Sequence, residues 1–327
     1  MEMECHVKAN GVSANPVIFL MGPTASGKTG AAVEIFKRLP IELISVDSAL
    51  VYRDMNIGTA KPDAATLKQA PHHLIDVIDP TEAYSAAQFR ADALRFMADI
   101  TARGKIPVLV GGTMLYFKAL QGGLGDLPEA DAAVRAALDK EALQYGWPAM
   151  HAKLAQIDPE TAARLQKADA QRIQRALEIY EVSGKTMTQL FAEQISTALP
   201  YRLLKLALVP SDRSVLHQRI AMRFDQMLQD GFIDEVKALR NKYPTLHADL
   251  PAMRCVGYRQ ALQYLDGAIT KTELREKGIA ATRQLAKRQL TWLRGMDDTV
   301  ELDCLEPSMH ERVYKSIQQF IQDENKG

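Results

Sequence analysis

The sequence predicts an α/β fold in which a parallel sheet is flanked by helices and interrupted by an all-helical insertion. Apolar runs at residues 17–21, 41–46 and 106–110 have the length and composition of buried strands, and helical segments separate them. A charged, alanine-rich stretch from Asp131 to about Gln194 has no strand signal, and the apolar run 203–210 then resumes the sheet. We therefore expect a core of residues 1–125 and 196–327 around a helical insertion domain of residues 126–195.

The composition is that of a globular protein without a strong charge bias. The 327 residues are 47% hydrophobic and 24% charged, and the formal net charge is zero, so overall charge predicts neither a nucleic-acid nor a membrane partner. Cys5, Cys255 and Cys304 lack CxxC or Cys/His spacing, which argues against a disulfide framework or a structural zinc. Residues 1–15 lack the apolar core of a signal peptide, and no run of about 18 apolar residues occurs, so we expect a cytoplasmic protein without a membrane partner.

The first strand leads directly into a phosphate-binding motif. Residues 22–29 read GPTASGKT and fit the P-loop pattern G-x-x-x-x-G-K-[ST], so the expected sheet is P-loop NTPase-like. Successive backbone N–H groups and the start of the next helix attract an anion, Lys28 adds a positive charge, and Thr29 offers a hydroxyl to Mg²⁺. A ligand-free glycine-rich turn is the alternative, which the register of strand, lysine and helix disfavours. The motif leaves open whether the bound phosphate group is hydrolysed, transferred or held as a leaving group.

The second strand carries a carboxylate to the same edge of the sheet. Gly30–Leu39 reads as a helix that Pro40 ends, and the run 41–46 then leads to Asp47. Ligands of parallel α/β sheets gather beyond the carboxyl ends of the strands, so Asp47 is expected beside the P-loop. It could bind Mg²⁺, act as a general base, or only cap the following segment as an Asx residue.

The segment before the third strand reads as a loop, two histidines and a helix. Residues 52–62 (YRDMNIGTAKP) are not periodic, so we expect either a loop over the site or a solvated connector. His72 and His73 have no third ligand at zinc spacing and are expected to make structural contacts or hydrogen bonds. Residues 85–103 have helical periodicity, with Ser85 in the position of an N-cap.

The third strand ends without the acidic residue expected of an ATPase. Gly111, Gly112 and Thr113 follow the run 106–110, where a Walker B aspartate would otherwise stand. The glycines allow backbone to approach a ligand, and Thr113 brings a hydroxyl to the active edge. Capping of a helix at 114–120 is the alternative role of Thr113.

The last third of the chain concentrates positive charge. Residues 254–294 contain nine basic and three acidic residues, a net charge of +6 in a neutral chain. Basic residues flank an apolar helical stripe there, which suits a helix that packs on the core and presents cations to a phosphodiester chain. Trp292 and Tyr258 are available for stacking, and a solvated basic face is the alternative. In the insertion, glutamines and arginines at 171–175 could likewise bond phosphates or base edges, or be only solvated.

Several longer strings together resemble one enzyme family. GPTASGKT, DSALVYR, IGTAKP, PHHLID, GGTMLY, QRIQRALEIYEVSGK, RCVGYRQ and KRQLTWLR are similar to bacterial tRNA dimethylallyltransferases, the delta(2)-isopentenylpyrophosphate transferase family, from about Ile18 to Arg294. The resemblance implies that the P-loop holds the diphosphate of dimethylallyl diphosphate with Mg²⁺. It implies that the prenyl group goes to N6 of adenosine 37, in the anticodon stem-loop of tRNA, and we expect the enzyme to be a monomer.

The resemblance also assigns roles to residues. Asp47 matches the general base and Thr113 the residue at the mouth of the channel, with Lys28 as the third catalytic group. The diphosphate-binding residues are Gly22, Pro23, Thr24, Ala25, Ser26, Gly27, Lys28 and Thr29, together with Arg219 or Arg223, and Thr29 also contacts Mg²⁺. The tRNA-binding residues are Asp47, Ser48, Ala49, Leu50, Thr113, Arg135, Gln171, Arg172, Ile173, Gln174, Arg175, Arg254, Cys255, Val256, Gly257, Tyr258, Arg259, Arg283, Lys287, Arg288, Gln289, Leu290, Thr291, Trp292, Leu293 and Arg294. Leu50 replaces the family's usual Gln, so a side-chain amide contact is not expected at that position.

The chemistry that the resemblance implies agrees with these residues. An exocyclic adenine amine is a poor nucleophile, so a carboxylate that takes its proton is useful, and the departing diphosphate needs cations. The adenosine has to leave its stack to reach the sheet edge. No water has to be activated, which accounts for the missing Walker B acid. Two rival functions are a P-loop kinase for a nucleotide or small molecule, which leaves the basic segment without a role, and a nucleotide-dependent RNA-binding switch without transfer chemistry.

Overall fold

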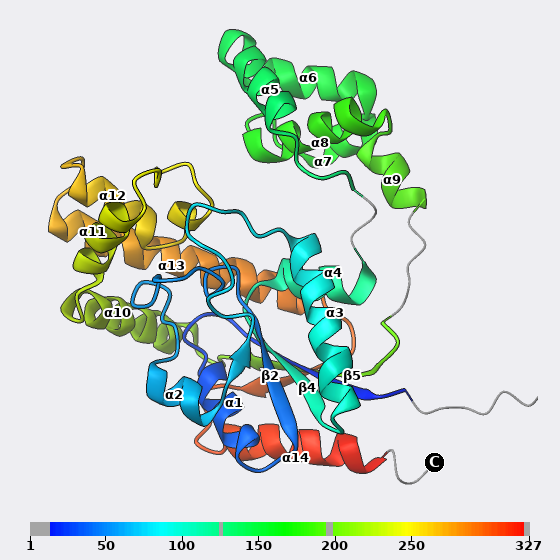
Figure 1. Ribbon diagram of the computed structural model, residues 1–327, viewed down its shortest axis with the longest axis vertical. Coiled ribbons are helices and arrows are strands. Elements are labelled where there is room, and N and C mark those ends of the chain that lie inside the picture. The colour runs from blue at the N-terminus through cyan, green and yellow to red at the C-terminus, as the bar shows by residue number, and fades with distance from the viewer. Residues whose placement is uncertain (1–13, 124–126, 194–198, 324–327) are drawn as a thin grey trace, which may run out of the picture. The chain divides into compact units, whose positions relative to one another are not determined.

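The structure, a computed structural model, divides into two compact units (Figure 1). It describes residues 14–123, 127–193 and 199–323. Unit 1 comprises Met1–Gln121 and Leu199–Gly327, and unit 2 comprises Gly122–Ala198. Cys5, the segment 1–13 and the expected domain boundaries at 125/126 and 195/196 lie outside the described residues.

A six-stranded parallel sheet forms the centre of unit 1. Its strands are β1 (Pro16–Met21), β2 (Ile41–Val46), β3 (His72–His73), β4 (Ile106–Gly111), β5 (Arg202–Val209) and β6 (Thr299–Asp303), in the spatial order β3-β2-β4-β1-β5-β6. The four strands predicted from apolar runs are confirmed, because they fill the middle of the sheet and are covered on both faces. The two edge strands were not predicted, since β3 has only two residues and β6 carries charged residues and is partly exposed.

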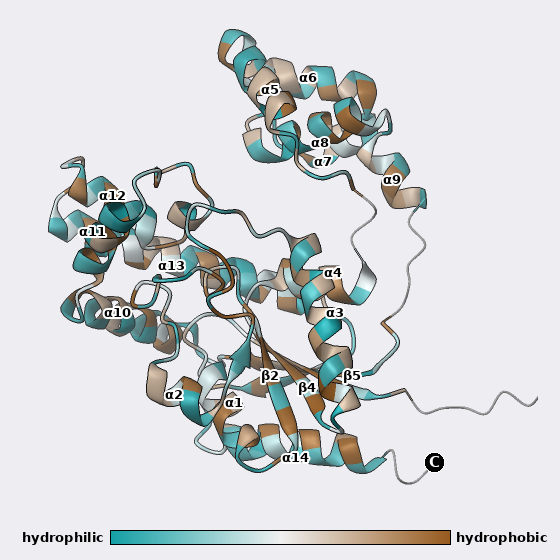
Figure 2. Ribbon diagram, in the orientation of Figure 1, coloured by the Kyte–Doolittle hydropathy of each residue, from teal (hydrophilic) through white to brown (hydrophobic). Residues whose placement is uncertain are grey.

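Helices cover both faces of the sheet, and the strands between them are largely hydrophobic (Figures 1 and 2). One face is covered by α1 (Lys28–Phe36) and α14 (Met309–Gln322), and the other by α3 (Ala86–Ala102) and α4 (Met114–Gly122). Ile35 and Val313 are fully buried on the first face, and Phe89 and Phe117 on the second. The predicted N-cap is confirmed, because Ser85 forms a reciprocal capping box with Gln88. Helix α1 begins two residues earlier than expected and ends before Lys37, while the short α2 (Ala64–Gln69) precedes β3.

A second hydrophobic core of unit 1 is formed by the helices of the last third. They are α10 (Arg213–Gln229), α11 (Phe232–Lys242), the 3₁₀ turn Ala252–Arg254, α12 (Tyr258–Leu265) and α13 (Lys271–Arg294). Their core contains Phe224, Phe232 and Tyr258, and it continues to Ala25 of the P-loop and to Met55. Packing therefore joins this helical group to the edge of the sheet where the P-loop begins.

Unit 2 contains only helices among its described residues. They are α5 (Ala132–Tyr145), α6 (Trp147–Ile157), α7 (Pro159–Arg164), α8 (Ala170–Ser183) and α9 (Met187–Glu193). Leu138, Met150, Leu154 and Leu177 lie in a core of its own. Throughout the described part of the chain, no helix combines the length and the apolar character that a bilayer span requires.

Candidate active site

A cavity of about 270 Å³ lies where strands β1, β2 and β4 end. Residues of the P-loop form one part of its lining, and Asp47 from the end of β2 forms another. Gly111 and Gly112 contribute from the end of β4, and Arg223 contributes from α10. The cavity thus brings together segments that lie far apart in the sequence, at the carboxyl edge where parallel sheets bind ligands.

The P-loop backbone is shaped to receive an anion. A side chain at Gly22 would place its Cβ 2.7 Å from Ser26 Oγ and 2.8 Å from the carbonyl of Leu208, so only glycine fits there. Ala25 and Gly27 both have left-handed backbone conformations, with φ of 65° and 84°. Such a turn directs successive N–H groups inward, and α1 starts immediately behind it. The loop therefore has the backbone form expected of a phosphate-binding turn.

Lys28 lies folded along the inside of the loop. Its Nζ donates hydrogen bonds to the carbonyls of Gly22 at 2.8 Å and Pro23 at 2.6 Å. Burial lowers the pKa of Lys28 to about 8, the negative charge of Asp47 opposes this shift, and the positive charge of Arg223 adds to it. An incoming diphosphate would supply the missing counter-charge, so it would favour the ammonium form.

Asp47 both supports its own loop and lines the cavity. Its Oδ1 accepts a hydrogen bond from the N–H of Ala49 at 2.8 Å, which is the Asx-type cap considered from the sequence. Burial raises the pKa of Asp47, against the opposing effects of the Ala49 N–H and of Lys28. A carboxylate whose proton affinity is raised is a better general base, provided that it is deprotonated at the working pH.

Thr113 fixes the segment that follows Asp47. Its N–H donates to the carbonyl of Val46 at 3.1 Å, and its Oγ1 accepts from the N–H of Ser48 at 3.0 Å. Gly111 is required for the same approach, because a Cβ there would overlap the carbonyl of Val46. Gly111 thus makes room for the neighbouring strand, and its backbone also lines the cavity, as expected from the sequence. The hydroxyl of Thr113 holds the Asp47 loop and forms no cap on α4 within the described residues.

Of the two candidate arginines, Arg223 is the one that lines the cavity. Arg219 lies one turn earlier on α10 and directs its guanidinium toward the carbonyl of Cys304, at 3.4 Å. Cys255 also lines the cavity, and burial raises the pKa of its thiol to about 12, so the thiol stays neutral. A cation from α10 thus faces the P-loop across the cavity.

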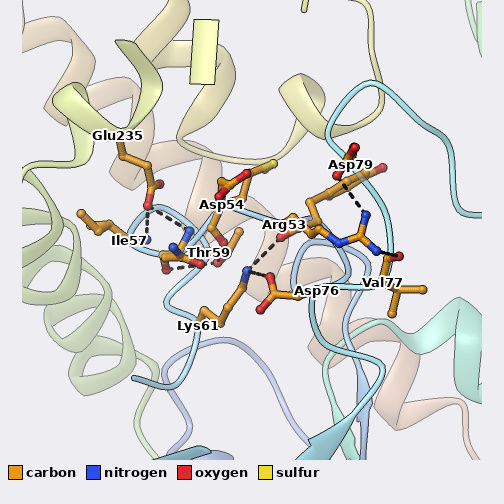
Figure 3. Close-up of polar contacts among 12 residues, drawn as sticks. Arg53, Asp54, Ile57, Thr59, Lys61, Asp76, Val77, Asp79 and Glu235 are labelled. Carbon is orange, nitrogen blue, oxygen red and sulfur yellow. Dashed lines mark hydrogen bonds and ion pairs between the residues drawn. The ribbon is translucent and has the colours of Figure 1, made fainter. Parts of the chain in front are cut away.

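A loop that includes Gly58 forms another wall of the cavity, and Figure 3 shows the polar contacts that hold this loop. Glu235 of α11 accepts hydrogen bonds from the N–H groups of Asn56, Ile57 and Gly58, at 2.9, 2.6 and 3.2 Å. Within the loop, Lys61 Nζ donates to the carbonyl of Tyr52 at 2.8 Å and to Asp76. Gly58 and its neighbours line the cavity, so the expectation of a loop over the site is confirmed and the solvated connector is not. Glu235 was not predicted, because no motif marks it.

Helix α13 has one cationic face and one buried face. Its exposed residues within the predicted tRNA-binding set are Arg283, Lys287, Arg288, Thr291, Trp292 and Arg294. The four cations in that list form no ion pair with any described residue, whereas Arg275 and Lys277 on the same helix pair with Asp225 and Glu273. Arg254 and Arg259 are also exposed and without ion pairs in the described ranges. Unpaired cations gather on the part of the surface that was expected to meet RNA.

Some residues of the expected tRNA-binding segments are buried, and these expectations are corrected. Tyr258 is fully buried and donates a hydrogen bond to Glu235 at 2.6 Å, so it is not available for stacking. Leu290, Leu293 and Ile173 belong to hydrophobic cores. Gln289 is 8% exposed and bonds to backbone of the cavity. The residues of a helical segment point in all directions around the helix axis, so the segment cannot contact a partner with all of them.

The predicted contact residues of unit 2 surround a buried carboxylate. Glu178 is inaccessible to solvent and accepts hydrogen bonds from Arg135 at 2.8 and 3.1 Å and from Arg175 at 2.7 Å. The side chain of Arg172 is by contrast 74% exposed, and among the described residues its one ion pair is with Asp169, three positions earlier. Gln174 donates to Asp139 at 2.6 Å, and Gln171 is exposed. Arg135 and Arg175 therefore have a structural function in addition to any contact with RNA.

Comparison with known proteins gives a consistent result. Residues 50–296 match the family model described as IPP transferase. The chain is 67% identical to the tRNA dimethylallyltransferase of Methylobacillus flagellatus, across 95% of this chain and 98% of the other, and 62% identical to that of a Janthinobacterium species, across 92% and 96%. Its fold is similar to the crystal structure of a tRNA isopentenylpyrophosphate transferase from Bacillus halodurans, with a TM-score of 0.69, 36% identity and coverage of 95% and 98%. It is also similar to a eukaryotic dimethylallyltransferase acting on tRNA, with a TM-score of 0.80, 27% identity and coverage of 95% and 80%.

Proposed function

Because the chain belongs to the IPP transferase family, we propose that its P-loop cavity is the place where a dimethylallyl group leaves its diphosphate and joins tRNA. The chain transfers a dimethylallyl group to tRNA. The observation that carries the placement is that the P-loop, Lys28 and Asp47 line one cavity. This combination offers a cradle for a leaving anion and a base for the group that replaces it.

The acceptor in this proposal is N6 of adenosine 37, next to the anticodon. The lone pair of this amine is delocalised into the purine ring, so loss of its proton has to accompany formation of the C–N bond. Asp47 would take that proton, and its raised proton affinity suits the task. The bond between the prenyl carbon and the diphosphate oxygen breaks as the C–N bond forms, and the electron pair stays with the diphosphate. The ordered Ser48 and Thr113 would position the adenosine at the carboxylate.

The leaving diphosphate would be stabilised by the groups of the opposite wall. The inward N–H groups of the P-loop, Lys28 and Arg223 supply positive charge where negative charge develops. Thr29 lines the cavity and its hydroxyl has no hydrogen-bond partner among the described residues, so it fits a Mg²⁺ ion that takes its other ligands from the diphosphate and water. Such an ion would neutralise part of the charge on the diphosphate oxygens.

The tRNA in this proposal is held by the cationic face of α13 and by unit 2. The exposed Arg283, Lys287 and Arg288 suit phosphates, and the ring of Trp292, which lies 5.6 Å from Lys118 Nζ, is 41% exposed and can stack on a base. The target adenosine then leaves its stack to reach the sheet edge. A single chain carries all these groups, so we propose that it acts as a monomer.

The direct test is mass spectrometry of nucleosides from tRNA incubated with the protein, dimethylallyl diphosphate and Mg²⁺. We expect an adenosine heavier by one dimethylallyl group, located at position 37 by fragment mapping. Asp47→Ala should lower the rate of product formation by roughly 10²-fold or more, while leaving tRNA affinity nearly unchanged. Consumption of ATP with a small acceptor, without any modified nucleoside, would instead indicate a kinase. tRNA binding without product under every condition would indicate an RNA-binding switch.

A further inference from the structure

Gln289 is the one side chain of the expected RNA-contacting segment at 287–294 that forms a hydrogen bond with the P-loop among the described residues. Its Oε1 accepts a hydrogen bond from the N–H of Thr24 at 2.9 Å. Its Nε2 donates to the carbonyl of Gly112 at 2.8 Å. One amide group therefore joins α13 to both the P-loop and the end of β4.

The amide fits tightly between these two segments. A Cβ at position 112 would overlap Nε2 of Gln289 and would lie 3.2 Å from the carbonyl of Gly22. Glycine at position 112 thus makes room for the amide, and its backbone also lines the cavity. Both polar ends of the side chain are satisfied in a nearly buried place, so the amide has one orientation with good hydrogen bonds.

Helix α13 presents two different faces to its surroundings. Thr282, Leu285 and Gln289 line the cavity, while Arg283, Lys287 and Arg288 lie on the exposed side. A rigid helix transmits the position of one face to the other. The contact that Gln289 makes with Thr24 therefore links the location of the cationic face to the location of the phosphate cradle.

We propose that Gln289 is a positioning residue: held on α13, its amide fixes the P-loop relative to the end of β4. The inference rests on the proposed function of the cavity and of α13. The hydrogen bond also occupies the N–H of Thr24, so the diphosphate is bound by later N–H groups of the loop. Loss of the amide would let the loop and the β4 edge shift relative to each other, and small displacements weaken catalysis strongly.

The experiment compares Gln289→Met with Gln284→Met, an exposed glutamine on the same helix. Met keeps the length of the side chain and removes both hydrogen bonds. We expect the Kd for pyrophosphate and the KM for dimethylallyl diphosphate to rise roughly 10-fold or more in Gln289→Met, with tRNA affinity within about twofold of wild type. The Gln284 variant should behave as wild type. An equal loss of tRNA affinity would make Gln289 an RNA contact and overturn the inference.

A double-mutant cycle provides a second, independent readout. Gly112→Ala should displace the amide and weaken pyrophosphate binding. In combination with Gln289→Ala it should weaken binding less than it does alone, because the displaced amide is already gone and only the close approach to the Gly22 carbonyl remains. Losses that multiply independently would contradict the coupling of the two positions. Measurements on the wild-type protein separate this test from the test of the proposed function. Pyrophosphate binding by the wild type without prenyl transfer would refute the function. Normal transfer by the wild type, with the Kd for pyrophosphate and the KM for dimethylallyl diphosphate unchanged in Gln289→Met, would refute the inference alone.

Discussion

Glu235 of α11 accepts a hydrogen bond from the backbone N–H of Ile57 at 2.6 Å, although the two residues are 178 positions apart. The same carboxylate also accepts from two neighbouring N–H groups and from the hydroxyl of Tyr258. Three N–H groups around one carboxylate resemble an anion-binding turn, here filled by the protein itself. The loop that forms this wall of the cavity is therefore held by the carboxylate of Glu235, which belongs to helix α11.

Replacing Glu235 by Gln should weaken the hydrogen bonds that hold this loop while keeping the volume of the side chain. The amide keeps one acceptor oxygen and turns an NH₂ group toward backbone donors, so we expect a destabilisation of about 2 kcal/mol and a raised KM for dimethylallyl diphosphate. Thermal unfolding and steady-state kinetics measure the two effects. Asp234→Asn, on the exposed neighbouring residue, is the control and should change neither quantity. Wild-type stability and KM in Glu235→Gln would show that the loop is held by other contacts.

The pH dependence of transfer should have an alkaline limb set by Lys28. The pKa of Lys28 lies near 8 in the free protein, so its charge is present below that pH and is lost above it. The Asp47 carboxyl, whose pKa is raised, has to be deprotonated, so activity also falls as the pH decreases. We expect a bell-shaped profile of kcat/KM for dimethylallyl diphosphate, with apparent pKa values that belong to the pair.

Lys28→Arg gives the matched comparison for this profile. Arginine stays charged throughout, so the alkaline limb should move to higher pH even if the absolute rate is lower. A wild-type profile that remains flat up to about pH 9.5 would contradict the assignment of the limb to Lys28. An alkaline limb that is identical in wild type and Lys28→Arg would assign it to another group.

The buried carboxylate of Glu178 predicts that two arginines of α8 have different functions, one in the stability of unit 2 and the other in RNA binding. Burial would raise the pKa of Glu178, but hydrogen bonds from Arg135 and Arg175 leave it below its usual value of 4.5. The stabilisation is thus present above that pH and is lost as the pH falls below it. Arg175→Ala should remove one partner and destabilise unit 2 by about 2 kcal/mol, measured by local hydrogen exchange.

Arg172→Ala is the counterpart in the same helix. Its side chain is largely exposed, so we expect weaker tRNA binding with unchanged exchange protection of unit 2. If both variants destabilised unit 2 equally, the exposed ion pair of Arg172 with Asp169 would contribute as much to its stability as the buried contact of Arg175 with Glu178. If neither changed tRNA affinity, the helix face at 171–175 would not be part of the interface.

The sequence predicted the features that depend on neighbours along the chain. Strand, P-loop and helix follow one another directly, so local sequence order alone places Lys28 and Asp47 at one edge of the sheet. The features that were missed depend on distant contacts. Gln289 and Thr24 are 265 positions apart, and the three backbone N–H groups that donate to Glu235 are 177 to 179 positions away. Hydrogen bonds between a side chain and backbone at such separations leave no local pattern in a single sequence.

The match of a sequence motif likewise did not predict which residues of a helical segment are buried. The segment 287–294 was predicted to contact tRNA as a whole, yet Gln289, Leu290 and Leu293 point into unit 1. The apolar stripe that includes Leu290 and Leu293 was visible in the sequence and could have divided the segment into two faces. The burial of Gln289 could not be predicted in this way, because a polar side chain on the buried side of a helix becomes evident only once its hydrogen-bond partners are known.

The cationic face of α13 gives a prediction that depends on which charges are already paired. Arg283 and Lys287 have no ion-pair partner among the described residues, so each can release a counterion from RNA. Arg283→Ala or Lys287→Ala should therefore weaken tRNA binding. Either change should also reduce the magnitude of the slope of log K against log salt by about 1. Lys277→Ala, on the same helix, removes a cation that already pairs with Glu273 at 3.6 Å, and its slope should stay near that of wild type. Filter binding over a range of salt concentrations measures all three. Equal slopes in the three variants would mean that net charge, and not the position of the unpaired cations, governs the encounter with tRNA.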